Sequence, residues 1–261
     1  MHITRLICLT LLLTSQVSFA ALSDAQAINQ AGRQRMLSQR MALSYLMVAS
    51  DVRADKGMRQ LDESMALFEE QMLNINEYLI NQKQVSALKE VQQLWAQHRM
   101  HLLQPPQKAN MASLLEENDA LLSACDKLVK HIALMTNQPS ALLVDVAGRQ
   151  RMLSERIAKL YLAKAWKVNM PSLDEKLRQA IELYDTSLQQ LQADKGNNPQ
   201  ISETLDKIAS QWSFAKSGFP LGEKGQFVPT MIVVTTESML NKNEQLTELY
   251  ATRMQQGLAQ R

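Results

Sequence analysis

The chain has 261 residues and a formal net charge of +2; 46% of its residues are hydrophobic and 21% are charged. These values are ordinary for a globular protein of one or two domains, and a nearly neutral chain offers no basic face for nucleic acid. With 8 Gly, 7 Pro and 5% aromatic residues, the composition argues against a turn-rich β-sandwich or barrel. We therefore expect an all-α protein.

The first 20 residues have the pattern of a cleavable signal peptide. A basic start precedes the apolar run Leu6–Leu13, and Ser18–Ala20 supplies a small-x-small cleavage site. The run is shorter than the roughly 20 apolar residues that span a bilayer, although an uncleaved anchor is the alternative. We expect the mature protein to begin at Ala21, to lie in the periplasm and to keep a single core thiol, Cys125.

The rest of the chain is a tandem repeat. Residues 31–46 recur as residues 147–162, and 12 of these 16 positions are identical. Beyond this motif, apolar residues at helical spacing in 61–75 correspond to apolar residues in 177–191. A duplication explains this similarity. We predict two tandem up-down four-helix bundles, one formed by residues 21–138 and the other by residues 139–261.

Capping and helix-breaking residues predict the helix ends in chain order. In the first half, Ser23–Gln26 can form a capping box, Lys56-Gly57 closes the first helix, the second ends near Leu79, the third ends at Leu103, and the fourth runs from a cap at Ser113 to about Asn137. In the second half, the corresponding signals are a stop at Pro171, a capping box at Ser172–Glu175, a break at Gly196–Pro199 and a loop at Gly218–Pro229.

The repeated motif carries more arginine than a plain core helix. A helical projection places Arg33, Met36 and Arg40 on one seam and Arg35 on the flank of another face. The first copy contains no acidic residue between Gly32 and Arg40. Because a buried arginine must be paired, and planar guanidinium matches planar oxyanions, this pattern suits a small anion. The alternative is a motif that persists because it packs helix on helix.

A glycine is retained inside the motif in both copies, although glycine costs about 1 kcal/mol relative to alanine within a helix. This indicates close approach of a second helix or of a ligand. The candidate ligand-binding residues are Gly32, Arg33, Arg35, Met36 and Arg40 in the first copy, and Gly148, Arg149, Arg151, Met152 and Arg156 in the second.

The segment Ile28–Arg40 resembles the signature of the PilJ/NarX-type sensor domain family, and the resemblance covers nearly the whole mature chain as two copies. That family includes the periplasmic input domains of nitrate/nitrite sensor kinases and of the type IV pilus methyl-accepting transducer. The resemblance implies a four-helix bundle whose first helix carries the ligand. In the nitrate sensors, the first helices of two subunits pair in parallel and hold nitrate on the dimer axis.

The resemblance also implies roles for individual residues. The arginine of the family's G-x-x-R-M element binds the anion, helped by the glycine, and a second arginine follows five residues later. These positions are Gly32, Arg35, Met36 and Arg40 in the first copy, and Gly148, Arg151, Met152 and Arg156 in the second. An arginine directly after the glycine, Arg33 or Arg149, departs from the nitrate-sensor pattern, and the core of the motif is more similar to the pilus-transducer branch.

The tandem arrangement predicts that the two motif helices lie parallel within one chain, so that Arg35 and Arg151 face each other as an intrachain pseudo-dimer; a homodimer is the alternative. We expect a non-catalytic periplasmic protein that binds a small oxyanion, with nitrate and nitrite as leading candidates. It would signal to a membrane-bound sensor or chemotaxis transducer. The alternative is a ligand-free interaction module. No constellation for catalysis, no metal motif and no cofactor motif is present in the sequence.

Overall fold

The computed structural model describes residues 21–219 and 226–259, so the expected signal peptide, residues 1–20, lies outside the described residues. The described chain is helical and contains no strand. Its helices are α1 (Asp24–Ala49), α2 (Ala54–Asn81), η1 (Val85–Leu88), α3 (Lys89–Leu102), η2 (Lys108–Asn110), α4 (Met111–Met135), α5 (Pro139–Ala165), α6 (Leu173–Gln192), α7 (Pro199–Lys216) and α9 (Pro229–Ala259). None of these helices is long and apolar enough to cross a membrane.

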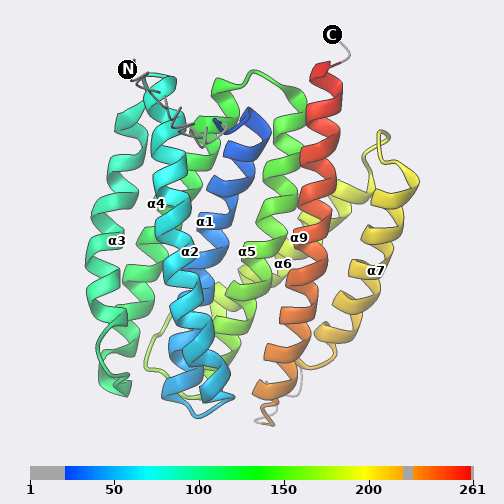
Figure 1. Ribbon diagram of the computed structural model, residues 1–261. Coiled ribbons are helices and arrows are strands. Elements are labelled where there is room, and N and C mark those ends of the chain that lie inside the picture. The colour runs from blue at the N-terminus through cyan, green and yellow to red at the C-terminus, as the bar shows by residue number, and fades with distance from the viewer. Residues whose placement is uncertain (1–20, 220–225, 260–261) are drawn as a thin grey trace, which may run out of the picture.

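The helices form two bundles that meet along α1 and α5 (Figure 1). Helices α1 to α4 form the first bundle, and α5, α6, α7 and α9 form the second. Helix α3 lies at one edge of the molecule and α7 at the opposite edge (Figure 1). A single cluster of buried apolar side chains runs through both bundles. The all-α tandem architecture is confirmed, whereas a division into separate domains at residue 138 stays a prediction.

The helix ends follow the sequence signals in part. Ser23 and Gln26 form the predicted capping box of α1. However, α1 ends at Ala49, before Gly57, because Asp51 and Arg53 adopt left-handed φ values of 58° and 54° in the turn to α2. Two other caps differ from their predictions in different ways.

Ser113 lies inside α4, which begins at Met111, so that predicted cap is wrong. Ser172 is the N-cap of α6 as predicted, but it forms no side-chain capping bond. A capping pattern in the sequence therefore does not by itself establish where a helix begins or which side chain caps it.

Aromatic pairs extend the repeat beyond the motif. Phe68 of α2 packs on Trp95 of α3 with ring centroids 4.6 Å apart, and Tyr184 of α6 packs on Trp212 of α7 at 4.3 Å. Trp95 Nε1 donates to Glu69, the residue after Phe68, at 3.2 Å. Trp212 Nε1 donates to Asp185, the residue after Tyr184, at 2.6 Å. The two tryptophans are therefore core residues that fix the same helix pair in each bundle.

Gly57 lies at a close contact between α2 and α1, and substitution there is expected to destabilise the fold. A Cβ atom at Gly57 would lie 2.9 Å from both the Met47 Cβ and the Ser44 carbonyl oxygen. Because the added methyl group would require the backbone of α1 or α2 to shift, we expect Gly57→Ala to lower the free energy of unfolding by about 1–3 kcal/mol. Urea titration measures this change, with an unchanged slope as the sign of a shared unfolding transition.

The chain offers a matched control for this substitution. A Cβ atom at Gly257, in α9, would meet nothing within 4 Å. Gly257→Ala should therefore keep or slightly raise stability, by up to about 1 kcal/mol from helix propensity. Equal effects of the two substitutions would show that the α1–α2 contact does not depend on glycine.

Candidate functional site

The two motif helices, α1 and α5, approach each other closely at the repeated glycines. A Cβ atom added at Gly148 would lie 4.0 Å from the Cα atom of Gly32. Further along both helices, Arg40 of α1 contacts Glu155 of α5. The contacts advance in the same direction on both helices, so α1 and α5 run parallel and in register. One chain therefore supplies the parallel pair of motif helices that the tandem repeat predicts.

The guanidinium groups of Arg35 and Arg151 converge at this crossing. Both side chains are fully buried. A Cβ atom at Gly32 would lie 3.3 Å from Nη2 of Arg151 and 3.5 Å from Nη2 of Arg35, and one at Gly148 would lie 3.2 Å and 3.6 Å from the same atoms. The missing side chains of the two glycines thus leave the space that both arginine tips occupy.

Carboxylates from other helices pair with these arginines. Arg35 donates from Nη1 to Asp126 of α4 at 2.8 Å. Its Nη2 forms an ion pair with the Asp145 carboxylate of α5 at 2.6 Å and donates to the Asp145 backbone carbonyl oxygen at 3.2 Å. Arg151 donates from Nη1 to Glu244 of α9 at 2.9 Å. The motif itself does not indicate these acids, because they lie in other helices or outside the Gly32–Arg40 segment. A signal existed: Asp126 and Glu244 occupy equivalent positions of the last helix in each half.

The two arginines are not equivalent electrostatically. The residue equivalent to Asp145 in the first half is Asn29, which has no carboxylate to pair with Arg151. Only the backbone carbonyl oxygen of Asn29 accepts from Nη2 of Arg151, at 3.1 Å. Burial opposes charge on Arg35, but Asp145 and Asp126 more than offset it and raise its pKa. Burial, followed by the positive charges of Arg33 and Arg35, lowers the pKa of Arg151. Arg151 is therefore the less compensated of the two cations.

Arg33 and Arg149 flank this pair at partly exposed positions. Arg33 forms an ion pair with Glu244 and lies 3.4 Å from Glu248, while Arg149 lies 3.2 Å from Asp145. Together with the buried pair they form an arginine–carboxylate cluster in which every arginine has an acidic partner. The projection that placed Arg33 on the seam and Arg35 on a flank was wrong about which is buried. Neighbouring helices enclose most of α1, so its flank lies in the interior.

The remaining predicted residues lie at a second level, further along α1 and α5. Arg40 contacts Glu155 at 3.3 Å, and burial raises the pKa of that carboxyl while Arg40 opposes the shift. Arg156 contacts Asp119 of α4 at 2.7 Å. The two motif methionines, Met36 and Met152, are buried. The ten candidate residues thus divide between the glycine crossing and this second level.

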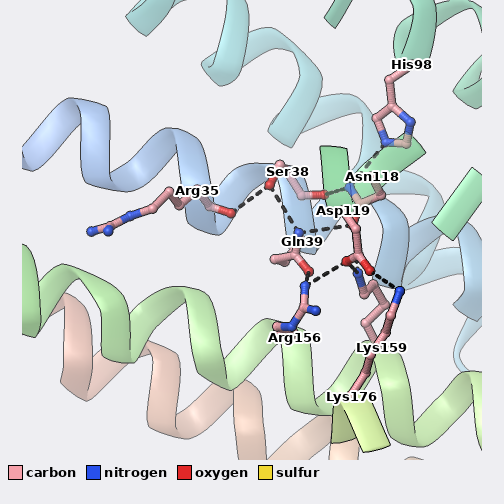
Figure 2. A network of polar contacts seen from close by, with 9 residues as sticks. All are labelled: Arg35, Ser38, Gln39, His98, Asn118, Asp119, Arg156, Lys159 and Lys176. Carbon is pink, nitrogen blue, oxygen red and sulfur yellow. Dashed lines mark hydrogen bonds and ion pairs between the residues drawn. The ribbon is translucent and has the colours of Figure 1, made fainter. Parts of the chain in front are cut away.

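A buried polar network surrounds Asn118 of α4 at the second level (Figure 2). The Asn118 amide donates to the Ser38 carbonyl oxygen at 2.7 Å and to His98 Nε2 at 3.3 Å. Its oxygen accepts from Gln39 at 3.0 Å and from the Lys159 ammonium at 2.8 Å. All hydrogen-bonding capacity of this amide is therefore used, which fixes the position of Lys159.

Three cations gather around Asp119 beside this amide (Figure 2). Besides Arg156, Lys176 of α6 lies 2.6 Å from one Asp119 oxygen and Lys159 lies 3.4 Å from the other. Their charges overcome the effect of burial and hold the pKa of Asp119 well below its usual range. Burial lowers the pKa of Lys159 to about 7, and that of His98 to about 3, so His98 is neutral.

An open groove of about 420 Å³ lies beside these cations, between α4, α5 and α6. Its charged lining residues are Asp119, Asp126, Lys130, Arg149, Arg156 and Lys176. Its apolar lining includes Met152 of α5 and Leu183 of α6, and Leu183 is 40% exposed. The groove lies within the size range of small-molecule sites and combines apolar surface with a few charged groups.

Comparison with known protein families identifies one family that the chain matches. The model of the family described as "Type IV pili methyl-accepting chemotaxis transducer N-term" (PilJ) matches residues 17–120 and 132–219, and each matched segment contains one copy of the arginine motif. No curated protein and no solved structure matches the chain. Because the family match covers more than half of the chain, the protein belongs to the PilJ family and is a signalling input module of the chemotaxis-transducer type.

Proposed function

We propose that this module binds one small oxyanion, with nitrate or nitrite as the leading candidates, between α1 and α5. The observation that carries the proposal is the pair of buried guanidinium groups, Arg35 and Arg151, converging over Gly32 and Gly148. The NarX-type nitrate sensors that the motif resembles hold their anion at an equivalent crossing of two first helices. Here one chain supplies both helices.

Each guanidinium has a donor to offer to such a ligand. The Nε–H groups of Arg35 and Arg151 are buried and have no acceptor among the described residues. A buried donor without an acceptor is costly, and Nε–H together with Nη2–H forms the fork that matches a planar oxyanion. Arg151 is the stronger candidate, because Asn29 stands where a carboxylate faces Arg35.

The carboxylates around the site supply a route for a signal. Glu244 of α9 and Asp126 of α4 are both partly exposed and hold the Nη1 atoms of the two arginines. An incoming anion would compete with these carboxylates and weaken the contacts that join α9 and α4 to the motif helices. A membrane-bound sensor or chemotaxis transducer would receive that change. The leader expected at residues 1–20 supports a periplasmic location for this exchange, which is part of the proposal.

A second candidate is an interaction module without a ligand. It is favoured by the arginine–carboxylate cluster, since Arg33, Arg35, Arg149 and Arg151 each have an acidic partner in the described chain. In that case the cluster joins the two bundles and the protein signals by docking alone. The two candidates differ in a measurable property, namely whether an anion binds the native state.

Calorimetric and thermal-shift titrations with nitrate, nitrite, sulfate and phosphate test the proposal, because a ligand that binds the native state raises the unfolding midpoint. We expect one nitrate or nitrite per chain. Glu244→Gln removes an internal competitor and should raise affinity roughly tenfold. Arg151→Lys keeps the charge but loses the fork, and should weaken binding by a similar factor.

Glu203→Gln is the matched control for Glu244→Gln, since it removes the same charge from an exposed ion pair on α7. Its anion affinity should equal that of the wild type. If no anion raises the midpoint of either the wild type or Glu244→Gln, the ligand-free module is the correct candidate. Two independent sites per chain would contradict a shared site between the motif helices.

A further inference from the structure

The two bundles are internal copies, so equivalent positions reveal where one copy has acquired additional chemistry. The clearest difference lies around Asp119 of α4, whose equivalent in α9 is Glu237. Asp119 is surrounded by Arg156, Lys159 and Lys176. At the corresponding positions of the first copy stand Arg40, Leu43 and Gln60. The second copy therefore has two lysines at a site where the equivalent positions of the first copy have none.

The equivalent face of the molecule, between α9, α1 and α2, is formally balanced. There, Arg40 and Lys56 are paired with two carboxylates, Glu237 and Glu155. Gln60 completes that face as a neutral hydrogen-bond donor to Glu237 at 3.0 Å. Two cations thus stand against two acids on this face.

The face around Asp119 carries an excess of positive charge. Three cations share that single carboxylate, and the residue that would match Glu155 is the neutral Gln39, whose oxygen lies 3.5 Å from Arg156. The reduced pKa of Lys159, about 7, reflects the same excess together with burial. The groove lining holds four cations and two carboxylates, and a net excess of one sign in a cleft attracts a counter-ion.

The excess charge borders a groove with apolar surface. Arg156 and Lys176 line the groove directly, whereas the Lys159 side chain is fully buried. Leu183 of α6 is 40% exposed there, and Met152 lines the same groove. An inorganic ion would neutralise the cations but leave this apolar surface in water. An anion with an apolar group would satisfy both.

We propose that the groove between α4, α5 and α6 binds a small organic carboxylate with an apolar body. Its carboxylate lies against Arg156 and Lys176, and its apolar part covers Met152 and Leu183. This site is separate from the crossing of Arg35 and Arg151, and the inference does not depend on anion binding at that crossing. A volume of about 420 Å³ suits a ligand of this kind.

Calorimetric titration of the full chain with benzoate tests this inference. Benzoate supplies both a carboxylate and an apolar ring, acetate supplies the carboxylate alone, and benzyl alcohol supplies the ring alone. We expect saturable binding of one benzoate per chain at millimolar concentration or below, with much weaker binding of acetate, benzyl alcohol and inorganic phosphate. Acetate or phosphate binding as tightly as benzoate would overturn the apolar part of the site.

The repeat supplies substitutions that one copy already tolerates. Lys176→Gln installs the residue found at position 60 and should weaken benzoate binding roughly tenfold, because a charge-assisted contact is lost. Lys56→Gln removes the same charge from the equivalent face and should leave the affinity unchanged. Benzoate that fails to saturate in the millimolar range, or equal weakening by the two substitutions, would overturn the inference. Nitrate titration of Lys176→Gln should match the wild type, which separates this site from the motif crossing.

Discussion

Replacing Arg35 with alanine is expected to lower the free energy of unfolding by about 3–5 kcal/mol, the cost of leaving a buried charge without its partner. Arg35 is fully buried. Its removal leaves Asp145, which is itself almost entirely buried, without its main cation in an apolar interior. Arg151→Ala should cost less, roughly 1–3 kcal/mol. Its partner Glu244 is partly exposed and keeps the ion pair with Arg33.

A double variant separates the buried charge from lost packing. Asp145→Asn installs the residue that the first half carries at the equivalent position, Asn29. In the Arg35→Ala background it should recover a substantial part of the lost stability, because the unpaired carboxylate is then gone. Urea unfolding of the four proteins in this cycle measures the coupling. Equal losses for Arg35→Ala and Arg151→Ala, or no recovery in the double variant, would contradict the asymmetry described above.

Sequence reasoning reached the helical class, the duplication and the glycine crossing because each depends on local or repeated pattern. Gly32 and Gly148 interrupt helices at a cost, and their retention in both copies indicates close helix approach. The parallel pairing follows from the tandem order of two similar halves. None of these inferences needs knowledge of contacts between distant side chains.

The acidic partners could not be found in the same way. Asp126 lies 91 residues from Arg35, and Glu244 lies 93 residues from Arg151. Pairing them requires the relative rotation of α4 and α9 about their axes, which tertiary packing sets. The motif alone therefore indicated unpaired arginines that could bind an anion, whereas in the folded chain carboxylates already pair with these arginines. This difference makes competition between ligand and carboxylate the central question for anion binding.

Lys159 shows the same limit of a local pattern. The sequence places a lysine where the first copy has Leu43, but helical projection cannot establish that its ammonium is fully buried. Burial follows from α4 and α6 closing over this part of α5, and Asn118 and Asp119 then hold the charge. A lysine at a position that is apolar in the first copy therefore carries a strongly lowered pKa and makes this part of the fold sensitive to pH.

Lys159→Leu, which restores the residue of the first copy, is expected to change how stability depends on pH. In the folded protein the pKa of Lys159 is about 7, because burial and the charges of Arg156 and Lys176 outweigh attraction by Asp119. In the unfolded chain a lysine pKa is about 10.4. Between these values the unfolded state binds more protons, so the free energy of unfolding of the wild type rises with pH. Neighbouring His98 is already neutral in this range.

The measurable quantity is the stability difference between Lys159→Leu and the wild type, since other groups titrate in both proteins. The variant should be favoured most at and below about pH 7, where the wild type keeps a buried ammonium. That advantage should shrink by about 2 kcal/mol between about pH 7 and pH 9, at roughly 1.4 kcal/mol per pH unit once titration is under way. Lys159→Met, which keeps the length of the side chain, should give the same change.

A difference that stays constant across this range in urea unfolding would show that Lys159 does not lose its proton in the folded protein. The cation excess around Asp119 would then be permanent, and the groove would hold its full positive charge at every physiological pH.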